Sequence, residues 1–189
     1  MRLVLASSSP RRRDLLARIA VVPERIASPD IDETPRKGEI ARVYALRMAI
    51  EKAQAVARAE GEIVIAGDTT VAVGRRILPQ AADADMQRSF LELLSGRRHH
   101  VMSAVCVIDG EGKVRHRISD SIVRFKRLGA AEIEAYIASG EGLGKAGGYA
   151  IQGRAEALID WMAGSHSGVV GLPLYETRTL LRSAGYPVE

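Results

Sequence analysis

The chain has few of the residues that mark disulfide-bonded or membrane-spanning proteins. Cys106 is the single cysteine among 189 residues, so no disulfide can form within the chain and we expect a reducing, cytoplasmic location. No apolar run approaches the roughly 18 residues of a membrane span. The apolar stretch between Arg2 and Arg11 is shorter than a signal peptide requires. We therefore expect a soluble protein that does not bind membranes.

Aromatic residues and excess charge are also scarce. Phe, Trp and Tyr make up 4% of the chain, and 27 basic side chains are nearly balanced by 23 acidic ones. Because proteins bind nucleic acids through aromatic platforms and strongly basic surfaces, this composition argues against a nucleic-acid partner. A nucleic-acid-binding module, suggested by the pI of about 9.5 and the basic run 97–100, is the weaker interpretation.

Three common catalytic signatures are missing. The four histidines show no HExxH-like spacing, which argues against a zinc hydrolase. The glycine-rich segment GEGLGKAG (140–147) lacks the Lys-Ser or Lys-Thr ending of a phosphate-binding P-loop. In GSHSG (164–168), histidine occupies the place that a nucleophilic serine would take, so a serine hydrolase is weakly supported.

What the sequence does contain is an alternation of β-type and helical segments, which predicts a single α/β domain spanning residues 1–189. We expect a mixed, bent central sheet with flanking helices, in two lobes. In the helical segment 38–61, apolar residues that recur every three or four positions predict the buried face: Ile40, Val43, Leu46, Ile50, Ala53 and Ala57. The expected strands are 2–6, 62–74, 100–109, 113–128 and 156–162. The expected helices are 38–61, 82–96, 130–140, 173–185 and one that begins at Pro10. A hairpin turn is expected at 109–112, and the expected core face of helix 82–96 is formed by Met86, Phe90, Leu91 and Leu94. The expected loops are 27–37, 140–153 and 163–172.

The first strand leads into SSSPRRR, where Ser9 is placed as a helix N-cap and Pro10 at the first helical position. Arg11, Arg12 and Arg13 then fall in the first helical turn, where the helix dipole disfavours cations. A loop with hydroxyl groups, free backbone N–H groups and arginines forms a strong anion site. The alternative is that Ser9 caps the helix while the arginines extend into solvent.

The second informative junction is EIVIAGDTTV. Its glycine predicts that the apolar strand is broken or bent at Gly67-Asp68, with Asp68 just beyond the end of a strand. A buried carboxylate must be paired or bind a metal, so Asp68 is either a functional group or a structural partner of an arginine. Asp32 and Glu33 lie in an acidic loop and are solvated by default. Together with a cationic loop, however, the three carboxylates suit a hydrolase that uses Mg²⁺ to act on phosphoryl groups.

Six strings occur in the same order as in the Maf family of nucleoside triphosphate pyrophosphatases: LASSSPRRRDLL, DIDE, AGDTTV, LSGRRHHV, KAGGYAIQG and VVGLPLYET. The resemblance covers nearly the whole chain. It implies an inosine-triphosphate-pyrophosphatase-like fold with two lobes around a cleft, and commonly a homodimer. It also implies hydrolysis of a nucleoside triphosphate to the monophosphate and pyrophosphate with a divalent cation, Mg²⁺ or Mn²⁺.

Positions that match the family's motifs take on its roles by resemblance. Asp68 resembles the proton acceptor that activates the attacking water, and Glu33 an acidic residue near the metal; with Asp32, these are the expected metal ligands. The residues expected to bind substrate are Ser7, Arg11, Arg12, Lys52, Thr69, Gln80, Lys145 and Gln152.

The choice of base is also expected from the resemblance. Arg11, Thr69 and Gln152 match positions linked to base selection, and the string 149–152 is similar to that of the branch that prefers dTTP and UTP. The branch that acts on 7-methyl-GTP looks different there. A buried Gln152 would offer both a donor and an acceptor to the edge of a pyrimidine.

Two residues depart from the family's pattern. Gln80 stands where a lysine is usual, and Gly144 stands where an aspartate often precedes KAG. A neutral amide cannot replace an ammonium on phosphate, so we expect reduced turnover or a substitute cation from Arg75, Arg76 or Lys145. These departures keep open a second interpretation, a nucleotide-binding regulator related to cell division with little or no catalysis.

Overall fold

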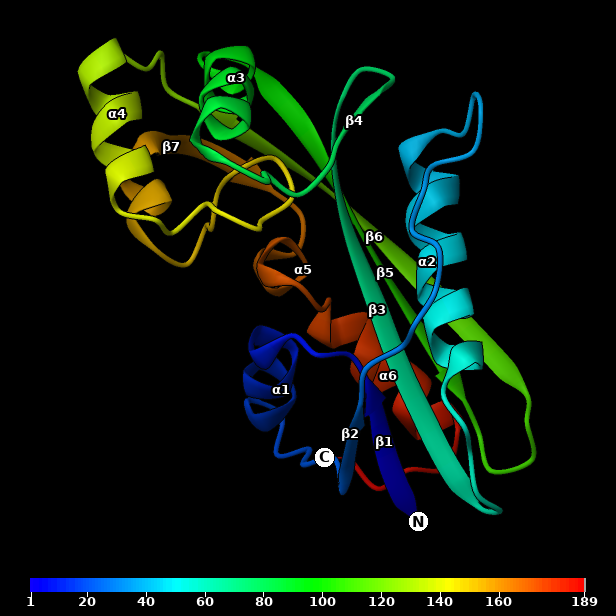
Figure 1. Cartoon of the computed structure of the whole chain (residues 1–189). Helices are drawn as coiled ribbons and strands as arrows, with labels where there is room; N and C mark the ends of the chain where they lie inside the picture. The colour runs from blue at the N-terminus through cyan, green and yellow to red at the C-terminus, as the bar shows by residue number, and fades with distance from the viewer. Residues whose placement is uncertain (189) are drawn as a thin grey trace.

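The computed structural model describes residues 1–188, and its centre is a seven-stranded mixed sheet (Figure 1). The strand order is β2-β1-β3-β5-β6-β7, with β4 paired to β3. The strands are β1 (Arg2–Ala6), β2 (Arg25–Ala27), β3 (Glu62–Val73), β4 (Arg76–Leu78), β5 (Arg98–Ile108), β6 (Val114–Phe125) and β7 (Ile159–Ala163). The α/β architecture confirms the predicted fold class.

Strand β3 is continuous through the junction where we predicted a break. We predicted that the strand is either broken or bent there; it pairs with β5 without interruption from Val64 to Ala72, so a break is wrong. On its other edge, β3 pairs in parallel with β1 up to Ile65 and antiparallel with β4 from Val71. Asp68 therefore lies inside a strand, at a stretch of edge that β1 and β4 leave open, rather than beyond a strand end.

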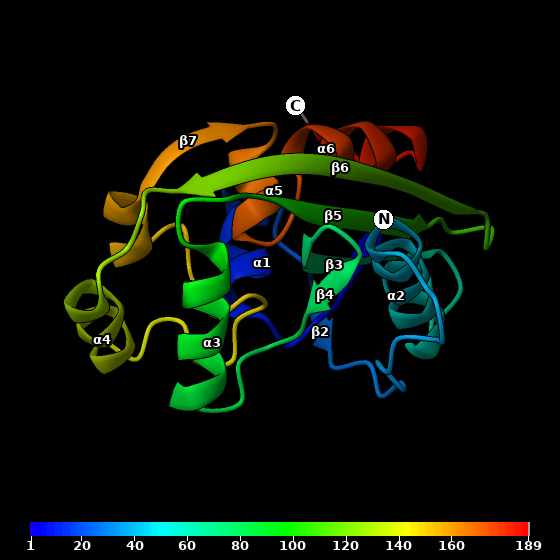
Figure 2. The ribbon, with the colours of Figure 1, turned by 90° about the horizontal axis from the view of Figure 1, so that it is seen from above.

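Helices cover both faces of the sheet. The helices are α1 (Pro10–Ala17), α2 (Ala41–Ala55), α3 (Ala84–Leu94), α4 (Ala130–Ala138), α5 (His166–Val170) and α6 (Leu174–Ser183), with a 3₁₀ turn at Arg154–Leu158. Side chains of β1 and β3 alternate between two cores: Leu3 and Leu5 pack with α1 and α6, whereas Val4 and Ala6 pack with α2. Figures 1 and 2 show α2 apart from α1, α5 and α6, while α3 and α4 lie together at one end of β5 and β6.

The buried face of α2 differs from the predicted one. Of the residues expected in the core, Ala53 is buried and Leu46 and Ile50 are partly buried, whereas Ile40 and Val43 are about half exposed and Ala57 is exposed. The centre of the buried face is formed by Ala45, Met48 and Ala49, which are fully covered. Small side chains allow a helix to approach a sheet closely. Lys52 lies on the same buried face of α2.

The remaining elements largely follow the prediction. In α3, Phe90, Leu91 and Leu94 are buried as expected, and β5 and β6 form the predicted hairpin. The segment 163–172 was expected to be a loop but contains the short helix α5, in which Ser165 accepts a hydrogen bond from Gly168 N. Within residues 1–188, the helices are all too short or too polar to cross a bilayer.

Candidate active site

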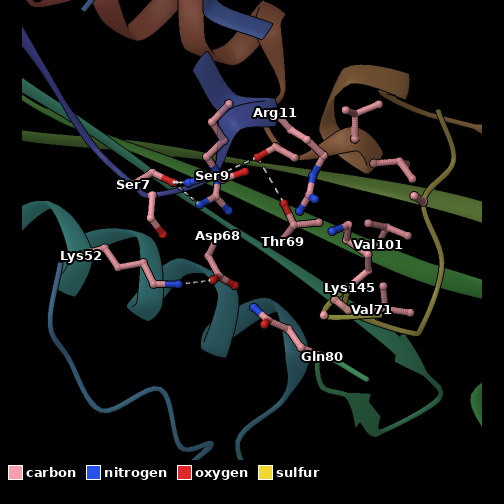
Figure 3. Close-up of a pocket in the computed structure, with 18 of the residues that line it drawn as sticks. Ser7, Ser9, Arg11, Lys52, Asp68, Thr69, Val71, Gln80, Val101 and Lys145 are labelled. Atoms are coloured by element: carbon pink, nitrogen blue, oxygen red, sulfur yellow. Dashed lines mark hydrogen bonds and ion pairs between the residues drawn. The ribbon is translucent and has the colours of Figure 1, made fainter. Parts of the chain in front are cut away.

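A polar cavity of about 280 Å³ opens along the free edge of β3 (Figure 3). Most of its lining comes from the loop between β1 and α1, the middle of β3 and the glycine-rich loop 144–152. Further lining residues come from the segment 28–33, from α2, β5 and α5, and from Gly171, which follows α5. The predicted residues that line it are Ser7, Arg11, Arg12, Glu33, Lys52, Asp68, Thr69, Gln80, Gly144, Lys145 and Gln152.

The loop between β1 and α1 is held by Ser7 and Arg12. The buried Ser7 Oγ accepts hydrogen bonds from Ser9 N (3.2 Å) and from Arg12 Nη1 (3.0 Å). Ser9 occupies the N-cap position, but its side chain makes no capping hydrogen bond. Arg12 Nε also donates to the Gly171 carbonyl at 3.0 Å. The arginine is thus fixed against the cavity rather than extended into solvent.

Gly67 permits this packing. A Cβ atom at this position would lie 3.1 Å from the Ala104 carbonyl oxygen, 3.2 Å from a Leu172 methyl and 3.5 Å from Arg12 Nε. The glycine that precedes Asp68 therefore marks a close approach between chain segments rather than a break in the strand.

Two further cationic groups face the same cavity. Figure 3 shows Arg11 and Lys145 pointing toward each other from opposite walls. Burial lowers the pKa of Arg11, and burial followed by the charge of Arg11 lowers the pKa of Lys145. Arg13, by contrast, is exposed and pairs with Asp14 at 3.8 Å. Two of the three arginines thus line the cavity, which favours an anionic ligand.

The part of the cavity lined by β3 carries a buried carboxylate, Asp68, with fixed hydrogen-bond partners. Asp68 is 6% exposed; its Oδ1 accepts from Lys52 Nζ at 2.8 Å and its Oδ2 from Thr70 Oγ1 at 2.8 Å. The same ammonium donates to Glu33 Oε2 at 2.8 Å. Burial lowers the pKa of Arg12, and the charges of Asp68 and Glu33 act in the opposite direction. The cavity lining therefore combines cationic groups with two carboxylates.

The three predicted metal ligands are not gathered in one place. Glu33 and Asp68 both reach Lys52, whereas Asp32 is exposed, accepts a hydrogen bond from Thr34 N and does not line the cavity. No group of three or more His, Cys, Asp or Glu side chains suited to a metal occurs within residues 1–188. Magnesium often binds through one or two carboxylates together with substrate phosphates, and Glu33 with Asp68 fits that donor set.

Thr69 and Gln152 are the residues expected near the nucleobase, and Gln80 departs from the family pattern. Thr69 Oγ1 donates to the Gly171 carbonyl at 3.3 Å. Gln80 is exposed, bridges to Ala146 through its backbone, and points toward Asp68 (Figure 3). Gln152 lines the cavity but is exposed, so the expectation of a buried amide is wrong. It lies in the turn 151–153, directly before the 3₁₀ turn Arg154–Leu158.

The three residues that could replace the missing lysine differ in whether they line the cavity. Lys145 lines the cavity, whereas Arg75 and Arg76 are exposed and absent from its lining in the described chain.

The acidic loop is tied to α2 by contacts that sequence reasoning missed. Tyr44 Oη donates to the Glu33 carbonyl at 2.8 Å, and Arg47 Nη2 donates to the Thr34 carbonyl at 3.2 Å. Arg47 also makes two hydrogen bonds of 2.7 Å to the Glu39 carboxylate. The position of Glu33 therefore depends on these side chains of α2, for which the sequence offered only helical spacing.

Comparison with known proteins gives concordant results. The family model described as "Maf-like protein" matches residues 2–184. A dTTP/UTP pyrophosphatase of Sphingopyxis alaskensis is 67% identical over 186 residues, covering 98% of each chain. One of Novosphingobium aromaticivorans is 60% identical, covering 98% of this chain and 93% of the relative. A HAM1 protein from Coxiella burnetii shares the fold, with a TM-score of 0.50 and 16% identity over 97% of this chain and 99% of that one.

Proposed function

The chain belongs to the Maf family, and from this premise we propose that it hydrolyses dTTP and UTP to the nucleoside monophosphate and pyrophosphate. The observation that carries the proposal is that one cavity holds both kinds of group. Arg11, Arg12 and Lys145 line it together with a carboxylate, Asp68, whose position is fixed by Lys52. A nucleoside triphosphate needs cations for its phosphates and a base for the attacking water, and these residues supply both.

The triphosphate binds to the loop between β1 and α1. Ser8 and Ser9 line the cavity at the N-terminus of α1, where free backbone N–H groups and the helix dipole favour anions. Arg11 and Arg12 add two cations there. A triphosphate carries about three to four negative charges, so these groups offset much of the charge that binding brings into the cavity.

Asp68 acts as the proton acceptor. As the water oxygen forms its bond to the α-phosphorus, the water proton passes to Asp68 and the bond from the α-phosphorus to the bridging oxygen breaks, releasing pyrophosphate. Hydrogen bonds from Lys52 and Thr70 hold the carboxylate in one orientation before substrate arrives. Such preorganisation means that the carboxylate need not be reoriented during the reaction.

We propose a divalent cation, Mg²⁺ or Mn²⁺, as the cofactor, held by Glu33 and Asp68. When bound, it neutralises charge on the phosphate oxygens and lowers the pKa of coordinated water. Asp32 is the weakest of the three proposed ligands because it lies outside the cavity lining. We expect Asp32→Asn to leave the activating metal concentration unchanged and Glu33→Gln to raise it.

The nucleoside end of the substrate is proposed to lie near Arg11, Thr69 and Gln152, which line the same cavity. The amide of Gln152 has both a donor and an acceptor for the edge of a pyrimidine. We also propose a homodimer, as the family resemblance implies, and a cytoplasmic location, as the single cysteine suggests. Light scattering of the purified chain tests the first, and fractionation of cells tests the second.

The proposed function is tested with a panel of nucleoside triphosphates and either Mg²⁺ or Mn²⁺. We expect pyrophosphate from dTTP and UTP, little product from purine nucleotides, and loss of activity in Asp68→Asn. Asp120→Asn is a matched control, because Asp120 is a partly exposed aspartate on β6 that pairs with His100 outside the cavity. Nucleotide binding without pyrophosphate release would support a nucleotide-binding regulator instead.

A further inference from the structure

A buried imidazole that the proposed reaction does not use lies behind the cavity. His99, on β5, is 1% exposed and lies two residues before Val101, which lines the cavity. Its Nε2 atom is 2.7 Å from the Tyr149 hydroxyl, and its ring stacks on Phe125 with centroids 5.9 Å apart. Burial lowers the pKa of His99 to about 4, so the imidazole is neutral at neutral pH.

Tyr149 lies between His99 and the cavity in which we propose that the substrate binds. Its ring packs edge-on against His99 and Phe125, with centroid distances of 5.5 and 5.0 Å. Tyr149 itself lines the cavity, as do its chain neighbours Ala150 and Gln152. Burial raises the pKa of Tyr149, so its hydroxyl keeps its proton. The hydrogen bond to His99 therefore joins the core of the sheet directly to the loop that faces the nucleoside.

The loop that carries Tyr149 is rich in glycine and is held by hydrogen bonds to neighbouring segments. Three glycines with positive φ lie within it: Gly144, Gly147 and Gly148. Hydrogen bonds between side chains and backbone hold it on either side of Tyr149: Gln87 Nε2 donates to the Gly148 carbonyl at 3.1 Å, and Ala150 N donates to Tyr136 Oη at 3.0 Å. The bond between Tyr149 and His99 differs, because it anchors in the core the side chain of a residue that itself lines the cavity.

We infer that His99 is a positioning residue for nucleoside binding: its hydrogen bond to Tyr149 fixes the segment that presents Ala150 and Gln152 to the base. This inference rests on the proposed function, since the nucleotide is the ligand being positioned. It also predicts that His99 affects binding of the nucleoside but not binding of the phosphate groups. The phosphate groups bind to the loop between β1 and α1, which His99 does not contact.

The test compares His99→Phe, Tyr149→Phe and the double variant. Each single variant leaves one buried polar group without its partner, so we expect KM for dTTP to rise roughly five- to ten-fold while kcat changes by less than about two-fold. The double variant removes both groups, and its KM should lie well below the product of the single effects. His99→Gln retains an amide that can bond to the hydroxyl and should restore part of the affinity.

Two controls separate positioning from loss of structure. His100→Gln changes the next residue of β5, whose side chain pairs with Asp120 and does not line the cavity, and should leave KM unchanged. Inorganic tripolyphosphate, which lacks a nucleoside, should inhibit wild type and variants equally. Equal weakening of tripolyphosphate and dTTP binding, or unchanged KM in both single variants, would overturn the role of His99. Wild-type protein that releases no pyrophosphate would instead overturn the proposed function.

Discussion

Replacing Lys52 by methionine tests how the candidate catalytic carboxylate is held. The ammonium of Lys52 lies 2.8 Å from both Asp68 and Glu33, but the two pairs differ in burial. The side chains of Lys52 and Asp68 are 9% and 8% exposed, whereas that of Glu33 is 48% exposed. Methionine fills the space of the lysine stem, so the variant removes mainly the charge.

The expected loss of stability follows from this asymmetry. Breaking a buried ion pair by removing one partner costs about 3–5 kcal/mol, because the other charge stays buried without compensation. An exposed pair contributes only about 0–1 kcal/mol. Since Asp68 keeps its hydrogen bond from Thr70, we expect Lys52→Met to lower the free energy of unfolding by about 3 kcal/mol. Glu33→Gln, which leaves the buried pair intact, should lower it by less than about 1 kcal/mol.

Urea unfolding followed by circular dichroism measures both values at neutral pH. The double variant Lys52→Met/Asp68→Asn is the matched control, because a neutral amide at position 68 no longer needs a cation. It should be more stable than Lys52→Met alone. A loss below about 1 kcal/mol in Lys52→Met would show that Asp68 is solvated and would refute the reasoning from burial.

Three further predictions concern single positions. Gln80→Lys should raise kcat/KM for dTTP by adding a cation to the cavity wall; an unchanged or lower value would show that position 80 does not contact phosphate. Hydrogen bonds from Arg47 lower the pKa of Glu39 from 4.5 to about 2, so their contribution to stability is present above pH 4.5 and is lost as the pH falls toward 2. Acid unfolding should therefore be less steep in Arg47→Met than in wild type over that range. Gly67→Ala should destabilise the fold by about 1–3 kcal/mol in urea, because the new methyl would meet the Ala104 carbonyl oxygen at 3.1 Å; wild-type stability would contradict this.

The long elements of the fold could be predicted from the sequence because their patterns extend over many residues. The hairpin of β5 and β6 and the core face of α3 belong to this class. Strands β2 and β4 have three residues each and α5 has five, too few for a period to be visible. The buried face of α2 was predicted correctly at Ala53 but wrongly at Ile40 and Val43, which are more hydrophobic than Ala45 and Ala49, although close packing on a sheet selects small side chains.

The candidate site shows the same division. Motifs identified Ser7, Arg12 and Asp68, and all three line one cavity. Thr70 was missed, although the two-residue period of a strand places it on the same side of β3 as Asp68. The Gly171 carbonyl, which accepts hydrogen bonds from Arg12 and Thr69, could not be predicted, because a backbone acceptor has no residue signature.

The central claim is that water attacks the α-phosphorus with Asp68 as the proton acceptor. Hydrolysis of dTTP in ¹⁸O-labelled water, with the products separated and analysed by mass spectrometry, tests it most directly. We predict that a single labelled oxygen appears in the nucleoside monophosphate and none in pyrophosphate, and that Asp68→Asn abolishes both products. Label in pyrophosphate would place the attack on the β-phosphorus and contradict the proposed geometry.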